Sequence, residues 1–267
     1  MKSASLSGAA RIEAALSRAR NEHRGALVAY LVGGRPDREA FRETLAAVAA
    51  RCDLLEVGMP FSDPVADGPA IARAAGRSLA SGFTFDELLG ATAALEAPTP
   101  LVLFSYSNPL LALGLERAPA RLAEARIDGL VVPDLPFDTP EGEELAHACE
   151  RSGIAWIQLV TPLTTARRRA RVLERARGFV YAVLRAGTTG AETDTSASLE
   201  FLASLRRETP LPVCAGFGLR TADQARSLRG RVEGFVVGTA LVERIERGED
   251  PRPYLDSLRT ALHTSPR

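Results

Sequence analysis

Residues 26–57 read ALVAYLVGGRPDREAFRETLAAVAARCDLLEV, and this stretch sets the expectation for the fold. It opens with a continuous apolar run at 26–32 and closes with another at 54–57, as strands buried on both faces do. Between the two runs, Phe41 and Leu45 recur at helical spacing. The stretch therefore predicts a strand, a helix and a second strand within a parallel sheet.

The same alternation of apolar runs and amphipathic segments continues along the rest of the chain. Eight strands are predicted, at 26–32, 54–57, 101–104, 129–132, 155–160, 179–184, 213–216 and 234–238. Eight such units in 267 residues are typical of a (β/α)8 TIM barrel, and an open doubly wound sheet is the alternative. The unbroken series favours the closed barrel. We expect one α/β domain over residues 1–267, with an extra N-terminal helix at 11–20 closing the bottom of the barrel.

The composition excludes several classes of function. Thirty-three basic and thirty-three acidic side chains cancel, so no net positive charge favours nucleic acid or an anionic membrane. Lys2 is the only lysine, which leaves no Schiff-base lysine in the folded body, and three scattered histidines do not match a metal site. Three widely spaced cysteines and no long apolar span predict a cytoplasmic protein.

The second predicted strand carries a single acid, Glu56, and alternation along the strand points its side chain into the barrel. Burial without a partner would raise its pKa into the range useful for acid–base catalysis, whereas bonds to backbone amides would make it structural. Asp63 and Asp67 lie in the loop that follows, each flanked by turn residues. The local sequence does not decide which of the two is chemical.

Glycines follow the last two predicted strands, in CAGFG at 214–218 and VGTA at 237–240. Loops at these two positions, with a helix starting at about Thr239, predict a phosphate site, and tight turns are the alternative reading of the glycines. The polar segment 185–196, RAGTTGAETDTS, follows the sixth predicted strand at the same end. It is interpreted as a loop that closes over a ligand, or as a plain surface loop.

The stretch LEVGMPFSDPVADGP at 55–69 resembles the signature of the tryptophan synthase alpha subunit family. Other segments with the same resemblance follow in order: YLVGGRP at 30–36, YSNP at 106–109, DLP at 134–136, YAVLRAGTTGAE at 181–192, AGFG at 215–218 and VGTA at 237–240. The resemblance implies a lyase of tryptophan biosynthesis that cleaves indole-3-glycerol phosphate to indole and glyceraldehyde 3-phosphate by a retro-aldol reaction.

The resemblance also implies roles for particular residues. Glu56 and Asp67, rather than Asp63, would be the catalytic acids. The residues expected to bind substrate are Tyr30, Tyr181 and Thr189. Those expected to bind phosphate are Gly190, Gly216, Gly218, Gly238 and Thr239. Those expected to face a beta subunit, in an alpha–beta–beta–alpha complex, are Pro60, Asp63, Asn108 and Pro136. Pyridoxal phosphate is expected in that partner, and no cofactor in this chain.

The chain departs from the family pattern at a few positions. Arg35 stands where the first-strand motif has an aspartate, and Ala72 stands where a glutamine is usual. Neither change removes a catalytic group. Two other functions stay open on the sequence: a lyase that releases indole without a partner, and a catalytically silent barrel that only activates a beta subunit.

Overall fold

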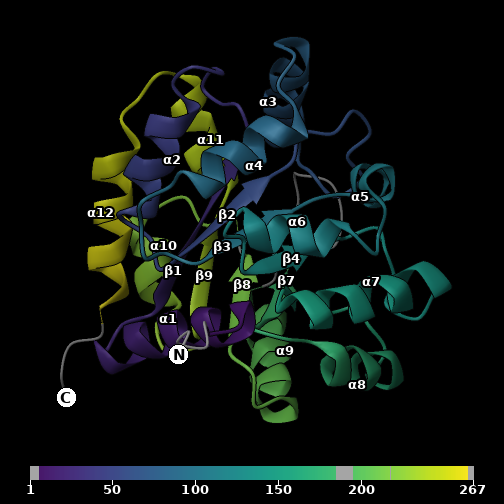
Figure 1. Cartoon of the computed structure of the whole chain (residues 1–267). Helices are drawn as coiled ribbons and strands as arrows, with labels where there is room; N and C mark the ends of the chain where they lie inside the picture. Colours follow the sequence, from purple (N-terminus) through teal and green to yellow (C-terminus); the bar gives the residue numbers. More distant parts are fainter. Residues whose placement is uncertain (1–5, 185–194, 217, 264–267) are drawn as a thin grey trace, which may run out of the picture.

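The computed structural model describes residues 6–184, 195–216 and 218–263. Within these ranges nine parallel strands form one sheet in the order β5-β4-β3-β2-β1-β9-β8-β7-β6, an almost closed α/β barrel (Figure 1). The strands are β1 (Ala26–Val32), β2 (Leu54–Gly58), β3 (Leu101–Phe104), β4 (Gly129–Val131), β5 (Ala155–Trp156), β6 (Gln158–Val160), β7 (Val180–Val183), β8 (Val213–Gly216) and β9 (Gly234–Val237). The predicted TIM-barrel class is confirmed.

The barrel closes through the segment 155–160, which the sequence predicts as one strand. That prediction is wrong in detail, because β5 pairs with β4 while β6 pairs with β7. Ile157 lies between them, and its N–H still donates to the carbonyl of Leu130 at 2.9 Å. The segment changes its partner at the seam of the barrel, and a continuous apolar run carries no signal of such a change.

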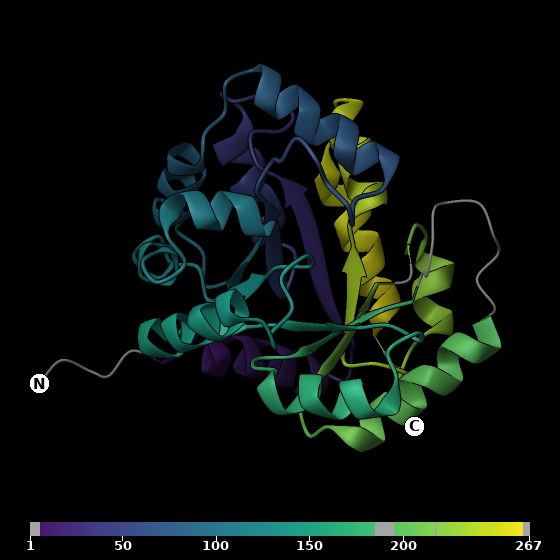
Figure 2. The same ribbon diagram turned by 90° about the vertical axis from the view of Figure 1, so that its right-hand side faces the viewer.

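Helices surround the strands on the outside of the barrel (Figure 2). They are α1 (Gly8–Asn21), α2 (Phe41–Ala49), α3 (Pro69–Ala80), α4 (Phe85–Ala93), α5 (Ser107–Leu113), α6 (Ala118–Glu124), α7 (Pro140–Ser152), α8 (Ala166–Arg175), α9 (Thr195–Glu208), α10 (Ala222–Ser227), α11 (Thr239–Glu246) and α12 (Pro251–Leu262). Two helices follow each of β2, β3 and β9. The first helices after β2 and β9, α3 and α11, lie near each other at the end of the barrel toward which β1 and β2 run (Figure 1).

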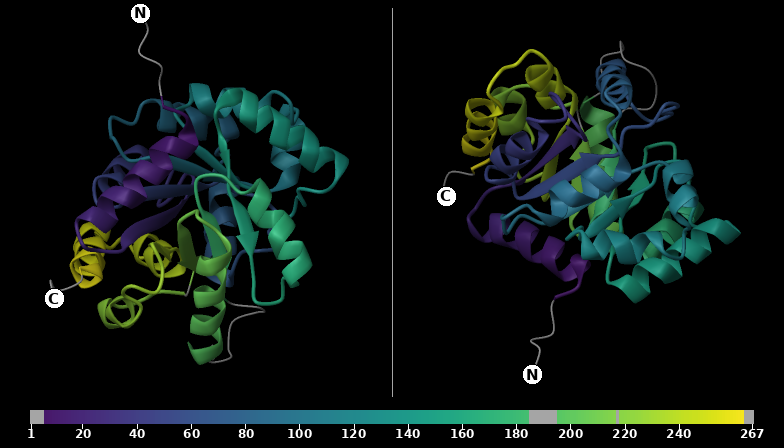
Figure 3. Two further views of the ribbon diagram at one scale, coloured as in Figure 1. Left: turned by 90° about the horizontal axis from the view of Figure 1, so that it is seen from below. Right: turned by 45° about the horizontal axis from the view of Figure 1, so that its top comes forward.

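The N-terminal helix α1 closes the opposite end of the barrel, as the sequence predicts. It lies below the strands in Figure 1 and in front of them when the molecule is seen from below (Figure 3). Ile12 and Leu16 are buried and pack into the barrel interior against Val28 and Leu54. Burial of each such side chain contributes about 1.5–3 kcal/mol. The helix starts at Gly8, where an added Cβ would lie 1.9 Å from the carbonyl oxygen of Asp128.

Two layers of apolar side chains hold the fold together. The inner layer fills the lower half of the barrel and includes Val102, Ile157 and Phe179, together with the inward face of α1. The outer layer packs the surrounding helices against the back of the strands. Since the lower half is filled, only the upper end of the barrel is left for polar groups. Within the described ranges no helix is long and apolar enough to cross a membrane.

Candidate active site

Glu56 lies in β2, and its side chain points into the barrel from the same face of the strand as Leu54. Only 1% of the residue is exposed, and neither carboxylate oxygen has a hydrogen-bond partner among the described residues. Burial raises the pKa of this carboxyl from 4.5 to about 8, because the charged form loses its hydration. The alternative of a structural glutamate bonded to backbone amides finds no support in these contacts. Near neutral pH the side chain is a neutral acid.

Asp67 lies in the loop between β2 and α3, and the hydroxyl of Tyr106 donates to its carboxylate. Desolvation raises the pKa of Asp67 to about 6, against the lowering effect of that hydrogen bond. The same hydroxyl accepts the N–H of Ala66 at 3.1 Å, and the Tyr106 ring stacks on Phe61 with centroids 5.2 Å apart. Asp67 does not cap α3, whose N-cap residue is Gly68. It is mostly ionised at neutral pH.

Tyr30 connects the two acids. Its backbone pairs with Glu56 across β1 and β2, and its pKa is raised by burial and then by the charges of Asp67, Tyr106 and Glu56. Both acids therefore lie near enough to the Tyr30 hydroxyl for their charges to raise its pKa. At the end of β2, an added Cβ on Gly58 would lie 2.1 Å from the Tyr30 Oη. The absence of a side chain at Gly58 makes room for this hydroxyl.

Tyr181 lies in β7 and approaches Glu56 and Tyr30 from there. Burial raises its pKa, followed by the charges of Glu56, Cys214 and Tyr30. The Tyr181 ring also lies against Gly216, where an added Cβ would be 3.4 Å from the ring. The two tyrosines that the sequence predicts as substrate-binding residues thus lie beside Glu56.

Two of the predicted phosphate-binding residues, Gly216 and Gly238, lie beside these tyrosines. Gly216 ends β8 next to Tyr181, and Gly238 follows β9, with an added Cβ 3.6 Å from the Tyr30 Cβ. Helix α11 begins at Thr239, as predicted, so its N-terminal amide groups lie at this end of the barrel. Gly218 is exposed and has a φ of +65°, a left-handed conformation that favours glycine.

Two predicted site residues lie outside the described residues. They are Thr189 and Gly190, both in the segment 185–194, and the predicted closing loop at 185–196 falls largely there as well.

The predicted partner-facing residues follow three strands at the same end of the barrel. Pro60 and Asp63 lie in the loop after β2, Asn108 in the first turn of α5, and Pro136 in the loop after β4. Asp63, Asn108 and Pro136 are exposed, whereas Pro60 is buried. The segments after β3 and β4 are tied together, because the Asp134 carboxylate accepts from the N–H of Ser107 at 2.9 Å and from its hydroxyl at 2.7 Å.

Two residues that shape this site are not among those predicted from the sequence. The hydroxyl of Tyr106 donates to the carboxylate of Asp67. Gly58 was not singled out, although it makes room for the Tyr30 hydroxyl. The segment LEVG at 55–58 ends in Gly58, and the reason for a glycine at this position is the Tyr30 side chain of the neighbouring strand β1.

Two carboxyl groups with raised pKa values at the open end of a parallel barrel define an α/β-barrel enzyme suited to acid–base catalysis. Among the described residues no group of three or more His, Cys, Asp or Glu side chains could hold a metal ion.

Comparison with known proteins narrows this class. A family model described as tryptophan synthase alpha chain matches residues 16–264. A tryptophan synthase alpha chain of Methanosarcina mazei is 40% identical over 245 residues, covering 91% of this chain and 89% of that one. One of Synechococcus sp. is 42% identical over 231 residues, covering 85% of each. A solved structure of Mycobacterium tuberculosis tryptophan synthase matches with a TM-score of 0.89 and 34% identity, over 98% of this chain and all of that one.

The chain belongs to the tryptophan synthase alpha chain family. It is a lyase of tryptophan biosynthesis that cleaves indole-3-glycerol phosphate. The resemblance on which the sequence analysis relied is confirmed.

Proposed function

We propose that Glu56 and Asp67 are the two catalytic acids of this cleavage. The observation that carries the proposal is the burial of Glu56 without a hydrogen-bond partner among the described residues, which keeps it protonated near neutral pH. A buried acid with no structural partner is costly to the fold, and such groups are concentrated in active sites. Asp67 is mostly ionised at neutral pH, because its pKa is about 6, so the two acids have opposite protonation states.

Glu56 acts first as an acid. Its proton goes to C3 of the indole ring, which makes the ring an electron-deficient indolenine cation. The hydroxyl on the adjacent side-chain carbon then loses its proton to the Glu56 carboxylate, and that carbon becomes an aldehyde. The electrons of the broken carbon–carbon bond return to C3. Indole and glyceraldehyde 3-phosphate are released, and Glu56 is again protonated.

Asp67 stabilises the cation that forms in between. Its carboxylate accepts the indole N–H, whose acidity increases when C3 is protonated. Tyr106 holds the carboxylate in place and keeps its pKa low enough for the charged form. Each of these acid–base contributions is worth roughly 10²–10⁴-fold in rate.

The substrate phosphate binds at the end of the proposed site away from the indole ring. It is held there by the backbone amides of Gly216, Gly238 and Thr239 and by the N-terminus of α11. Gly218 and Gly190 belong to the same proposed set, whereas Thr189 belongs with Tyr30 and Tyr181 to the proposed substrate-binding residues. A helix N-terminus and glycine amides hold a phosphate without any lysine. Binding at this remote group orients the indole end between the two acids.

The decisive assay is indole release from indole-3-glycerol phosphate by the purified protein. Glu56→Gln keeps the shape of the side chain and removes the transferable proton, so turnover should fall by at least roughly 10³-fold. Competition by glycerol 3-phosphate should persist in this variant. Near-normal turnover in Glu56→Gln would refute the role assignment, and no indole from the unaltered protein would favour a silent barrel.

We also propose that this chain works with a beta subunit that carries pyridoxal phosphate. The proposal is supported by exposed apolar side chains near the predicted partner-facing loops: Val65 is 79% exposed and Leu111 is 48% exposed. Asp63 precedes Val65 by two residues, and Asn108 precedes Leu111 by three. Indole release should increase when a beta subunit is added. Equal rates with and without it would favour the stand-alone lyase.

A further inference from the structure

Arg35, the residue that departs from the family pattern, forms an ion-pair cluster at the open end of the barrel. Its guanidinium donates to both carboxylate oxygens of Glu246, from Nε at 2.6 Å and from a terminal nitrogen at 3.1 Å. Arg77 contacts the second oxygen from the other side. The Arg35 and Glu246 side chains are only 14% and 13% exposed, so solvent screens this pair far less than a surface pair.

The cluster joins three segments that carry the proposed site. Arg35 follows β1, the strand of Tyr30. Arg77 belongs to α3, which starts two residues after Asp67. Glu246 ends α11, whose first turn holds the proposed phosphate-binding amides. Seven residues of helix, roughly 10 Å, separate Glu246 from Thr239, so a shift of one end of this short rod moves the other.

The apolar cluster under the ion pairs consists of Tyr30, Val32, Ala74, Ala75 and Val242, with Ile71 and Phe104 packed against it. Most of the side chains that the two helices contribute are small, two alanines from α3 and one valine from α11, and small side chains fix the position of one helix on another only weakly. A second polar tie, from the Ser78 hydroxyl to the Gly33 carbonyl at 2.6 Å, holds α3 to the loop after β1 but does not reach α11.

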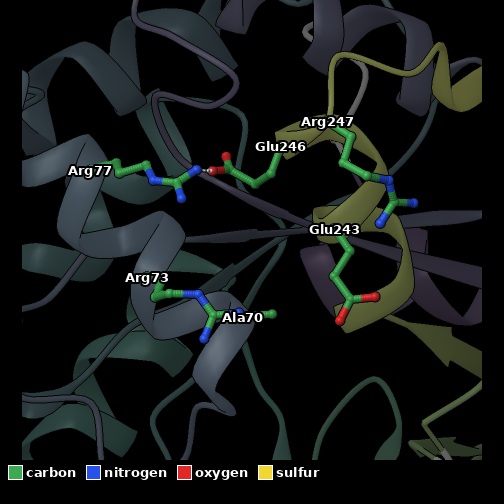
Figure 4. A pocket seen from close by; sticks show the side chains of 6 residues that line it. All are labelled: Ala70, Arg73, Arg77, Glu243, Glu246 and Arg247. Carbon is green, nitrogen blue, oxygen red and sulfur yellow. Dashed lines mark hydrogen bonds and ion pairs between the residues drawn. The ribbon is translucent and has the colours of Figure 1, made fainter.

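A cavity of about 230 Å³ opens between α3 and α11 beside the cluster, lined by Ala70, Arg73, Arg77, Glu243, Glu246 and Arg247 (Figure 4). Arg77 points across it to Glu246, and this ion pair spans the gap. The charged contacts therefore bridge α3 and α11 at this end, while Leu241 and Ile245 anchor the other face of α11 in the core.

We infer that Glu246, held between Arg35 and Arg77, is a positioning residue that sets the phosphate-binding end of α11 against the segments bearing Tyr30 and Asp67. The inference rests on the proposed function. It assigns Glu246 no contact with substrate. Its effect should fall on ligands that use the α11 N-terminus and spare ligands that bind only at the indole end.

Two inhibitors separate these ends of the site. Glycerol 3-phosphate probes the phosphate end, and indole, the product, probes the other. In Glu246→Gln the inhibition constant of glycerol 3-phosphate should rise roughly tenfold while that of indole stays within about twofold. KM should rise more than kcat falls. Arg35→Lys keeps the positive charge but loses the guanidinium that donates to both Glu246 oxygens. In this variant the inhibition constant of glycerol 3-phosphate should rise about threefold.

Glu249→Gln is the matched control. It removes ion pairs with Arg244 and Arg247 just beyond the end of the same helix, where both partners are exposed. Both inhibition constants should stay unchanged in this variant. Thermal unfolding of every variant shows whether the fold is intact, and if Glu246→Gln does not fold, Arg35→Lys and Arg77→Gln provide the same comparison.

The outcomes are distinct. A selective loss of glycerol 3-phosphate binding supports the inference. Equal losses for both inhibitors, or no loss for either, would overturn it while leaving the proposed function standing. If glycerol 3-phosphate does not compete even in the unaltered protein, the proposed phosphate site itself is wrong, and the inference falls with it.

Discussion

The unaltered protein should lose stability as the pH rises above 5, and replacing Glu56 by glutamine should remove this loss. The folded protein holds this proton up to a pKa of about 8, whereas the unfolded chain releases it near the ordinary value of 4.5. Between these two values the unfolded state binds fewer protons, so each pH unit lowers the free energy of unfolding by about 1.36 kcal/mol. From pH 5 to pH 9 the loss through this one group is about 4 kcal/mol. Glutamine does not ionise, so the free energy of unfolding of Glu56→Gln should not show this loss.

Urea unfolding at pH 5, 7 and 9 measures this difference directly. The two proteins should have similar stability at pH 5, and Glu56→Gln should be more stable by about 3 kcal/mol at pH 7. Glu124→Gln, which changes an exposed acid at the end of α6, is the control and should follow the unaltered protein. Parallel curves for Glu56→Gln and the unaltered protein would mean that Glu56 ionises freely in the folded state, and the proposed acid would be lost.

Three further results are expected. Tyr106→Phe removes the hydrogen bond that lowers the pKa of Asp67, so the acid limb of the kcat/KM–pH profile should move to higher pH. At pH 6 kcat/KM should fall roughly three- to tenfold. An acid limb at the same pH in both proteins would exclude this contact. Gly58→Ala should lower kcat/KM by at least roughly tenfold, because the new methyl group clashes with the Tyr30 hydroxyl. Adding Tyr30→Phe to this variant should recover part of the loss. No recovery in the double variant would point to another clash. Leu16→Ala should cost about 2–5 kcal/mol in urea unfolding and leave KM unchanged, since α1 closes the far end of the barrel; a large change in KM would contradict that separation.

Much of the fold follows from local pattern. Continuous apolar runs mark the strands because a parallel sheet covered on both faces leaves no polar side to its strands. The prediction of 26–32 and 101–104 matches β1 and β3 residue for residue. Alternation along β2 is also local, and it was enough to place Glu56 inside the barrel.

The split at Ile157 is different, because it depends on which strand lies on each side of the segment. β5 pairs with β4 and β6 pairs with β7. A strand's neighbour is a long-range property, and the local sequence of 155–160 does not reveal it. The sequence likewise predicts one helix per strand and does not separate α3, α5 and α11 from the helices that follow them.

The sequence by itself determined the barrel class and the inward direction of Glu56, and the family signature predicted Asp67 rather than Asp63 as the second catalytic acid. Only the tertiary structure decided that the Glu56 carboxyl has no partner among the described residues, that Tyr106 holds Asp67, and that Arg35 meets Glu246 across 211 positions of the chain. The physical reason is that side-chain direction follows from the period of the strand, whereas a pKa or an ion pair depends on every group that folding brings within a few ångströms.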